Sequence, residues 1–248
     1  MSEELDALVR MSAELGLPAN DFAMLGEGNT STRADAGSFW VKASGTQLCS
    51  ASRESFVRVR FEPVLAALDA EALDDAALKD LLKNATVEGQ RAPSIETFLH
   101  AMCLNLEGVS FVGHTHPTAA VGLLCGRNSR ELFSGSLFPD QIVVIGPALG
   151  YAPYADPGLP LAMAVRQTLD RYLDRHQRTP KVLLMENHGV IALGGTAQEV
   201  VNITHMLVKT CRVLAGSLTV GGPRFLTQAQ VDRIDKRPDE LARRRGFA

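Results

Sequence analysis

The chain has 248 residues, of which 46% are hydrophobic and 21% charged, and its formal net charge at pH 7 is −3. This length and hydrophobic share predict a globular protein with a sizeable core and exclude extensive disorder. The charges are spread without long like-charged blocks, which offers no footprint for nucleic acid or for an anionic membrane surface. No apolar run reaches the roughly 18 residues of a membrane-spanning helix. We therefore expect neither nucleic acid nor membrane as a partner.

The cysteines indicate a reducing environment. They are Cys49, Cys103, Cys125 and Cys211, and they form no CxxC pair. The beginning of the chain does not join a basic segment to an apolar one, as a secretory signal would. We expect free thiols and a cytoplasmic protein.

Hydrophobic periodicity and turn residues predict a mixed order of helices and strands. In chain order we expect a helix over 3–16, a hairpin with glycine-containing turns over 24–46 and a strand over 55–61. Three helices follow over 62–70, 75–85 and 94–106, and then a strand over 109–116 leading into an alanine-rich helix after Pro117. Further strands are expected over 141–146 and 181–194, with a helix over 159–176 between them and a long helix over 196–218 after them.

This order predicts one layered α/β domain over residues 1–220, because no Ser/Gly-rich linker divides the chain and no internal repeat is visible. Gly221, Gly222 and Pro223 then interrupt the pattern. Residues 221–248 are expected to form a peripheral C-terminal tail.

Three histidines stand where apolar runs end. His114 and His116 lie two residues apart in the predicted strand, so their side chains project from the same face. His188 follows a second apolar run and precedes a glycine. Three imidazoles can hold one divalent metal ion and leave a coordination position open, which suits catalysis. The alternative is a set of hydrogen-bonded histidines near strand ends, because HxH alone does not distinguish the two.

Six short motifs follow one another along the chain. They are GNTS at 28–31, KASGT at 42–46, PSIET at 93–97, GHTHP at 113–117, APYADPG at 152–158 and ENHG at 186–189. In this order they resemble the class II aldolase/adducin family, which contains fuculose and rhamnulose phosphate aldolases and a ribulose phosphate 4-epimerase. The resemblance covers roughly residues 5–215. It implies a single three-layer α/β/α domain with a central, mainly antiparallel sheet, assembled as a homotetramer with active sites at subunit interfaces.

The resemblance also implies a role for each matching residue. His114, His116 and His188 fall on the family's metal ligands, where zinc is usual and manganese or another divalent metal is the alternative. Glu96 falls on the acid/base carboxylate. The positions that hold the substrate's phosphate correspond here to Asn29, Ser44, Gly45 and Ser94.

The residues themselves suit this chemistry. Retro-aldol cleavage passes through an enediolate, which a divalent cation stabilises as a Lewis acid, and a desolvated carboxylate such as Glu96 can move the proton at the neighbouring carbon. Alternatively, Ser94 caps a helix and Glu96 lies in its first turn, although a capping box would place the acid at Thr97. The glycine-containing turns GEGNTS and ASGT can hold a phosphate with their backbone N–H groups and hydroxyls. Alternatively, they are ordinary hairpin turns.

Several residues depart from the family pattern or receive structural assignments. Ile95 follows Ser94 where many of the aldolases have a second serine, and residues 127–146 contain no tyrosine, so the group that protonates the aldehyde side is unassigned. Lys42 suggests a Schiff base, but nothing in the sequence marks its ammonium pKa as lowered, and we expect a structural or electrostatic role. Packed or surface positions are expected for the other helical or helix-end histidines, His100, His176 and His205.

Together these features predict a class II, zinc-dependent aldehyde-lyase that cleaves a phosphorylated ketose or a related sugar acid by a retro-aldol reaction. Its partner is then a small-molecule sugar phosphate. The alternatives are an epimerase, decarboxylase or dehydratase of the same family, and a non-catalytic adducin-like interaction domain. Such scaffolds have lost metal ligands, so the three histidines favour an enzyme. Epimerases of the family tend to carry Asp where Glu96 stands, which favours the lyase.

Overall fold

A computed structural model describes residues 3–69 and 74–246, so Ala70, the last residue of one predicted helix, lies outside the described part. The strands are β1 Asn29–Arg33, β2 Ser38–Lys42, β3 Phe56–Arg60, β4 Thr86–Glu88, β5 Phe111–Thr115, β6 Gly150–Ala152, β7 Val182–Met185 and β8 Gly189–Gly194. The helices are α1 Glu3–Leu15, α2 Phe61–Ala66, α3 Asp75–Ala85, α4 Thr97–Leu104, α5 Thr118–Leu124, α6 Ser129–Leu132, α7 Pro139–Ile145, α8 Leu159–His176, α9 Ala197–Leu218, α10 Gln228–Asp235 and α11 Pro238–Arg245.

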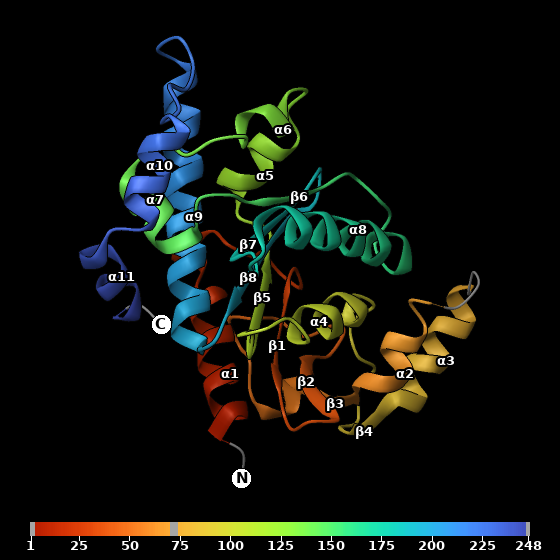
Figure 1. The fold of residues 1–248 in the computed structure, drawn as a ribbon. Helices are drawn as coiled ribbons and strands as arrows, with labels where there is room; N and C mark the ends of the chain where they lie inside the picture. Colours follow the sequence, from red (N-terminus) through yellow and green to blue (C-terminus); the bar gives the residue numbers. More distant parts are fainter. Residues whose placement is uncertain (1–2, 70–73, 247–248) are drawn as a thin grey trace.

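The strands form one central sheet in the order β4-β3-β2-β1-β5-β8-β7-β6. Neighbouring strands are antiparallel, except that β6 and β7 are parallel. Figure 1 shows α1 and α9 on one side of this sheet and α4 and α8 on the other. The prediction of an α/β fold with a mainly antiparallel central sheet is therefore confirmed.

Side chains alternate between two hydrophobic cores, one on each face of the sheet. Phe39 and Val41 of β2 face the core that includes residues of α2, α3, α4 and α8. Trp40, between them, faces the core that includes residues of α1, α5 and α9. β2, β5, β7 and β8 are buried along their whole length. This burial on both faces explains why β7 and β8 appear in the sequence as short, nearly continuous apolar runs.

One predicted strand is wrong. Residues 141–146 belong largely to α7, which begins at Pro139, a residue whose fixed φ suits the first turn of a helix. The β-branched run suggested a strand, but Ile142 and Val143 pack as helix residues against Val231 and Ile234 of α10. The edge position beside β7 is taken instead by β6, which the sequence did not predict.

The segment after residue 220 contains α10 and α11. The buried side chains of Val231 and Ile234 fix α10 against α7, so this part of the segment packs on the domain. The division at residue 220 stays a prediction. All four cysteines are free, as expected. Within the described residues, no helix has both the length and the apolar character needed to cross a membrane.

Three segments that are distant in sequence meet at one end of the central strands. β1 runs antiparallel to β5, so Asn29 at the start of β1 pairs with His114 near the end of β5. The turn between β7 and β8 reaches the same end, because β8 pairs with β5 on the side opposite to β1. This end of the strands carries the candidate site.

Candidate active site

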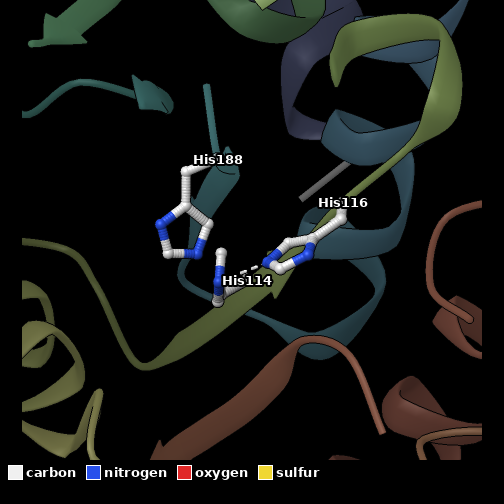
Figure 2. A group of neighbouring side chains, drawn as sticks. All are labelled: His114, His116 and His188. Atoms are coloured by element: carbon white, nitrogen blue, oxygen red, sulfur yellow. Dashed lines mark hydrogen bonds between the residues drawn. The ribbon is translucent and has the colours of Figure 1, made fainter. Parts of the chain in front are cut away.

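The three predicted histidines lie together, with their imidazoles turned towards one another (Figure 2). Their candidate ligand atoms all lie within 4.8 Å of one another, and the Nε2 atoms of His114 and His116 are 3.0 Å apart. Nitrogens bound to a tetrahedral zinc at about 2.0–2.1 Å are about 3.3 Å from each other. The cluster therefore has the size and the nitrogen donors needed to hold one divalent ion.

Glycines make room for this cluster. A Cβ atom on Gly189 would lie 2.6 Å from Cδ2 of His116, and one on Gly28 would lie 2.5 Å from the carbonyl oxygen of His114. The turn between β7 and β8 also needs the left-handed backbone of Asn187, whose φ is 52°. The glycines of GNTS and ENHG and the asparagine of ENHG thus have local reasons in the geometry around the histidines.

Hydrogen bonding fixes the orientation of His114, which is 1% exposed. Its Nδ1 lies 2.9 Å from the carbonyl oxygen of Val190, so Nδ1 carries the proton and donates it. Its Nε2 faces the other histidines and Glu96. Burial opposes a charge on His114, but the carboxylate of Glu96 and the hydrogen bonds to Glu96 and Val190 raise its pKa, so Nε2 becomes available to a metal once it has lost its proton. Burial and the neighbouring imidazoles of His114 and His188 lower the pKa of His116 to about 3, which keeps this ring neutral.

Glu96 lies against the histidines. Its Oε2 is 3.3 Å from Nε2 of His114 and its Oε1 is 3.2 Å from Nε2 of His188. The side-chain amide of Asn29 donates to Oε2 at 2.7 Å. Burial opposes ionisation of Glu96, but the charge on His114 and the hydrogen bonds from His114, His188 and Asn29 outweigh it and hold the pKa of the carboxyl well below its usual range. The carboxylate form therefore prevails in this arrangement.

The helix-capping explanation of Glu96 is wrong. Glu96 is itself the N-cap of α4, it makes no side-chain cap, and the helix begins at Thr97. Ser94 lies before the helix, where its hydroxyl accepts from the backbone N–H of Glu96 at 3.3 Å. The carboxylate of Glu96 is thus left to contact the histidines.

The residues proposed for phosphate lie on neighbouring segments. Asn29 donates to the hydroxyl of Ser94 at 3.1 Å, which places both beside Glu96. The backbone N–H of Ser44 donates to Ala92 at 2.9 Å, and that of Ser94 donates to Lys42 at 3.3 Å, so the KASGT turn lies against the segment that carries Ser94.

The KASGT turn borders an open pocket. Gly45 has φ +75°, which requires glycine, and the space where a Cβ would stand is empty within 4 Å. Ser44 lines a pocket of about 600 Å³ that also carries Lys79, Lys83 and Arg91. Three cationic side chains and one carboxylate, that of Asp80, thus line the space next to this turn together with apolar residues.

Lys42 is more deeply buried than the sequence indicated. It is buried, and burial lowers the pKa of its ammonium group although the charge of Glu96 opposes that shift. Its Nζ donates to the carbonyl oxygen of Thr46 at 2.5 Å and so closes the turn that carries Ser44 and Gly45. The sequence did not mark this pKa as lowered because it does not show how deeply β2 is buried, whereas the bond to Thr46 agrees with the structural role expected of Lys42.

His100 was assigned to packing, but it lies directly behind the site. It is 1% exposed, its Nδ1 is 2.6 Å from the hydroxyl of Ser31, and its Nε2 is hydrogen-bonded to Oδ1 of Asn29. Burial lowers its pKa to about 3. The sequence signal that could have found it is its position four residues after Glu96, which puts both on the same side of α4.

These features define an α/β protein with a three-histidine cluster and an adjoining carboxylate. The model of the class II aldolase and adducin N-terminal domain matches residues 7–215. The chain therefore belongs to this family, as the motifs predicted. The family includes divalent-metal-dependent aldolases, and the histidine cluster of this chain fits such an ion.

Solved structures share the fold. The N-terminal class II aldolase domain of a conserved protein from Thermoplasma acidophilum superimposes with a TM-score of 0.67 at 25% identity, covering 87% of this chain and 95% of that chain. An L-fuculose 1-phosphate aldolase gives a TM-score of 0.71 at 18% identity, with coverages of 95% and 96%. YgbL from Klebsiella pneumoniae, for which aldolase, epimerase and decarboxylase activities are the named candidates, gives 0.68 at 21% identity, with coverages of 94% and 97%.

A curated relative is much longer than the matched region. It is the uncharacterized oxidoreductase YuxG of Bacillus subtilis (strain 168), which is 25% identical over an alignment of 182 residues, and the match covers 70% of this chain. The chain spans about a quarter of that protein, since the match covers 24% of its length.

Proposed function

We propose that this chain is a metal-dependent lyase that cleaves a phosphorylated ketose, or a related sugar acid, by a retro-aldol reaction. The observation that carries the proposal is the contact of one buried carboxylate, Glu96, with two members of a three-histidine cluster. His114, His116 and His188 would hold the ion, which is proposed to be zinc, with manganese or another divalent metal as the alternative. When bound, the ion would act as a Lewis acid that stabilises negative charge on the substrate's oxygens.

Glu96 is proposed as the acid/base group. Its low pKa keeps it as a carboxylate, which is the form that can accept a proton from the carbon beside the substrate's carbonyl. That step belongs to the condensation direction; in the cleavage direction the hydroxyl of the aldehyde half would become a carbonyl and release its proton, and Glu96, once protonated by it, would deliver it to the enediolate carbon.

Asn29, Ser44, Gly45 and Ser94 are proposed to bind the substrate's phosphate. Ser94 accepts from Asn29 and from the backbone of Glu96, which leaves its own hydroxyl hydrogen to donate to a phosphate oxygen. The positive φ and open surroundings of Gly45 leave its backbone accessible for close approach. Lys79, Lys83 and Arg91 in the adjoining pocket support an anionic substrate.

Two alternatives use the same fold. Epimerisation, decarboxylation or dehydration of a sugar phosphate would use the same histidines and carboxylate, while an adducin-like interaction domain would need neither. The intact cluster and its glycine-dependent packing favour an enzyme. The oxidoreductase named among the relatives extends far beyond the matched region, so its activity is outside the proposal.

A substrate panel tests the proposal. The zinc-loaded protein is incubated with phosphorylated ketoses and the corresponding sugar acids, and the release of an aldehyde is followed with a coupled reductase. Cleavage by the wild type but not by Glu96→Gln supports the lyase. Epimerised or decarboxylated products without aldehyde would replace the lyase with the epimerase or decarboxylase alternative.

We also propose that the protein is cytoplasmic and forms a homotetramer. Light scattering after gel filtration would test the tetramer, which is expected to give four chain masses.

A further inference from the structure

A buried chain of hydrogen bonds lies behind the site and ends on Glu96. The hydroxyl of Ser31 is 2.6 Å from Nδ1 of His100, Nε2 of His100 is bonded to Oδ1 of Asn29, and Nδ2 of Asn29 is 2.7 Å from Oε2 of Glu96. All four residues are at most 8% exposed. His100 follows Glu96 by one turn of α4, so one helix end supplies both the acid and the far partner of Asn29.

The placement of the Asn29 amide sets the direction of every bond in this chain. Its Nδ2 lies 2.7 Å from Oε2 of Glu96 and 3.1 Å from the hydroxyl of Ser94, so the NH2 group donates there and Oδ1 faces His100. Because Oδ1 also only accepts, Nε2 of His100 must carry the ring proton and donate it. Nδ1 is then bare and accepts the hydroxyl hydrogen of Ser31. His100 is neutral, in agreement with the effect of its burial.

The Asn29 amide would otherwise have two orientations of nearly equal shape. Rotation by about 180° exchanges its oxygen and nitrogen, as the near-identity of the two amide ends allows. It would bring Oδ1 to the place where Nδ2 now lies 2.7 Å from the carboxylate and 3.1 Å from the hydroxyl of Ser94. Both N–H donors would then be lost from the site, and two acceptors would face each other in a buried place.

We propose that His100 is a positioning residue that locks the Asn29 amide in the orientation in which it donates to Glu96 and Ser94. No hydrogen bond or ring contact joins it to His114, His116 or His188, and it acts on Glu96 through Asn29. Its structural effect stands on the hydrogen bonds alone, whereas its effect on turnover rests on the proposed function of Glu96. Ser31 takes part by holding the tautomer of His100 that donates to Asn29.

Two substitutions separate positioning from packing. His100→Gln places an amide N–H near the position of Nε2 and keeps the donor to Asn29, whereas His100→Asn reaches only the position of Nδ1 and keeps the partner of Ser31. We expect His100→Asn to lower kcat by on the order of 10- to 100-fold, as losses of supporting hydrogen bonds around metal sites do. His100→Gln should recover most of kcat, and both variants should retain zinc and the wild-type circular dichroism. Equal losses in the two variants, or an undiminished kcat in His100→Asn, would overturn the proposal.

The tautomer of His100 can be measured without turnover, even if the variants fold poorly or no sugar phosphate is cleaved. The side-chain ¹⁵N resonances of zinc-loaded wild type are recorded, and those of His100 are assigned by their loss in whichever variant folds, or by residue-specific labelling. A protonated Nε2 and an unprotonated, hydrogen-bonded Nδ1 are expected, with Nε2–H exchanging slowly. A protonated Nδ1 would reject the locking mechanism. If the expected tautomer is found but no compound of the substrate panel is cleaved, only the proposed function is rejected.

Discussion

Replacing Gly189 with alanine tests whether this glycine is required by the histidine cluster. The added Cβ would lie 2.6 Å from Cδ2 of His116, 2.7 Å from the carbonyl oxygen of Thr115 and 3.3 Å from Cε1 of His114. Carbon atoms in contact are normally about 3.5–4.0 Å apart, so the methyl overlaps the His116 ring by about 1 Å. A backbone oxygen of a central strand cannot easily move, so the ring and the turn between β7 and β8 must shift.

Overpacking of this kind costs about 1–3 kcal/mol in unfolding free energy. Displacement of His116 should in addition weaken zinc binding by on the order of tenfold or more, by analogy with the loss of supporting groups around metal sites. Urea unfolding of the metal-free protein measures the first effect, and competition with a chromophoric chelator measures the second. The matched control is Gly216→Ala in α9, where a Cβ meets nothing within 4 Å and should add about 0.5–1 kcal/mol of helix stability. If Gly189→Ala equals wild type in both stability and zinc affinity, the assigned role of this glycine is refuted.

Three further predictions concern the proposed chemistry. Glu96→Gln should abolish turnover while zinc content and thermal stability remain near wild type, and retained turnover in a steady-state assay would remove Glu96 as the base. Ser94→Ala should raise KM for phosphorylated substrates more than for their unphosphorylated counterparts, and an unchanged ratio of the two KM values would argue against a phosphate contact. Removal of the metal with a chelator should eliminate activity but leave the fold intact by circular dichroism, because the two hydrophobic cores do not depend on the ion; unfolding on chelation would indicate a structural metal instead.

The sequence predicted the histidine cluster because simple geometry connects the residues. Alternation along a strand puts His114 and His116 on one face, and the apolar run before His188 indicated a second strand ending nearby. The family match over residues 7–215 agrees with the motifs that carried the resemblance. These features depend on local pattern, which a sequence displays directly.

The features that the sequence missed depend on contacts between distant segments. His100 meets Ser31 and Asn29, which precede it by 69 and 71 residues, so only the pairing of β1 beside α4 reveals its role. The apolar residues of α7 gave a strand-like pattern, and it is packing against α9 and α10 that accompanies their helical form. Propensity is a weak guide where tertiary packing decides the outcome.

The metal content of the purified protein, measured by elemental analysis without added metal or chelator, tests most directly whether the three histidines hold a metal ion. The comparison is with a variant that carries both His114→Ala and His116→Ala. A single three-histidine site predicts about one zinc or other divalent ion per chain in wild type and none in the variant. A wild type that takes up no metal even when zinc is supplied would contradict it and would favour an interaction domain without catalysis.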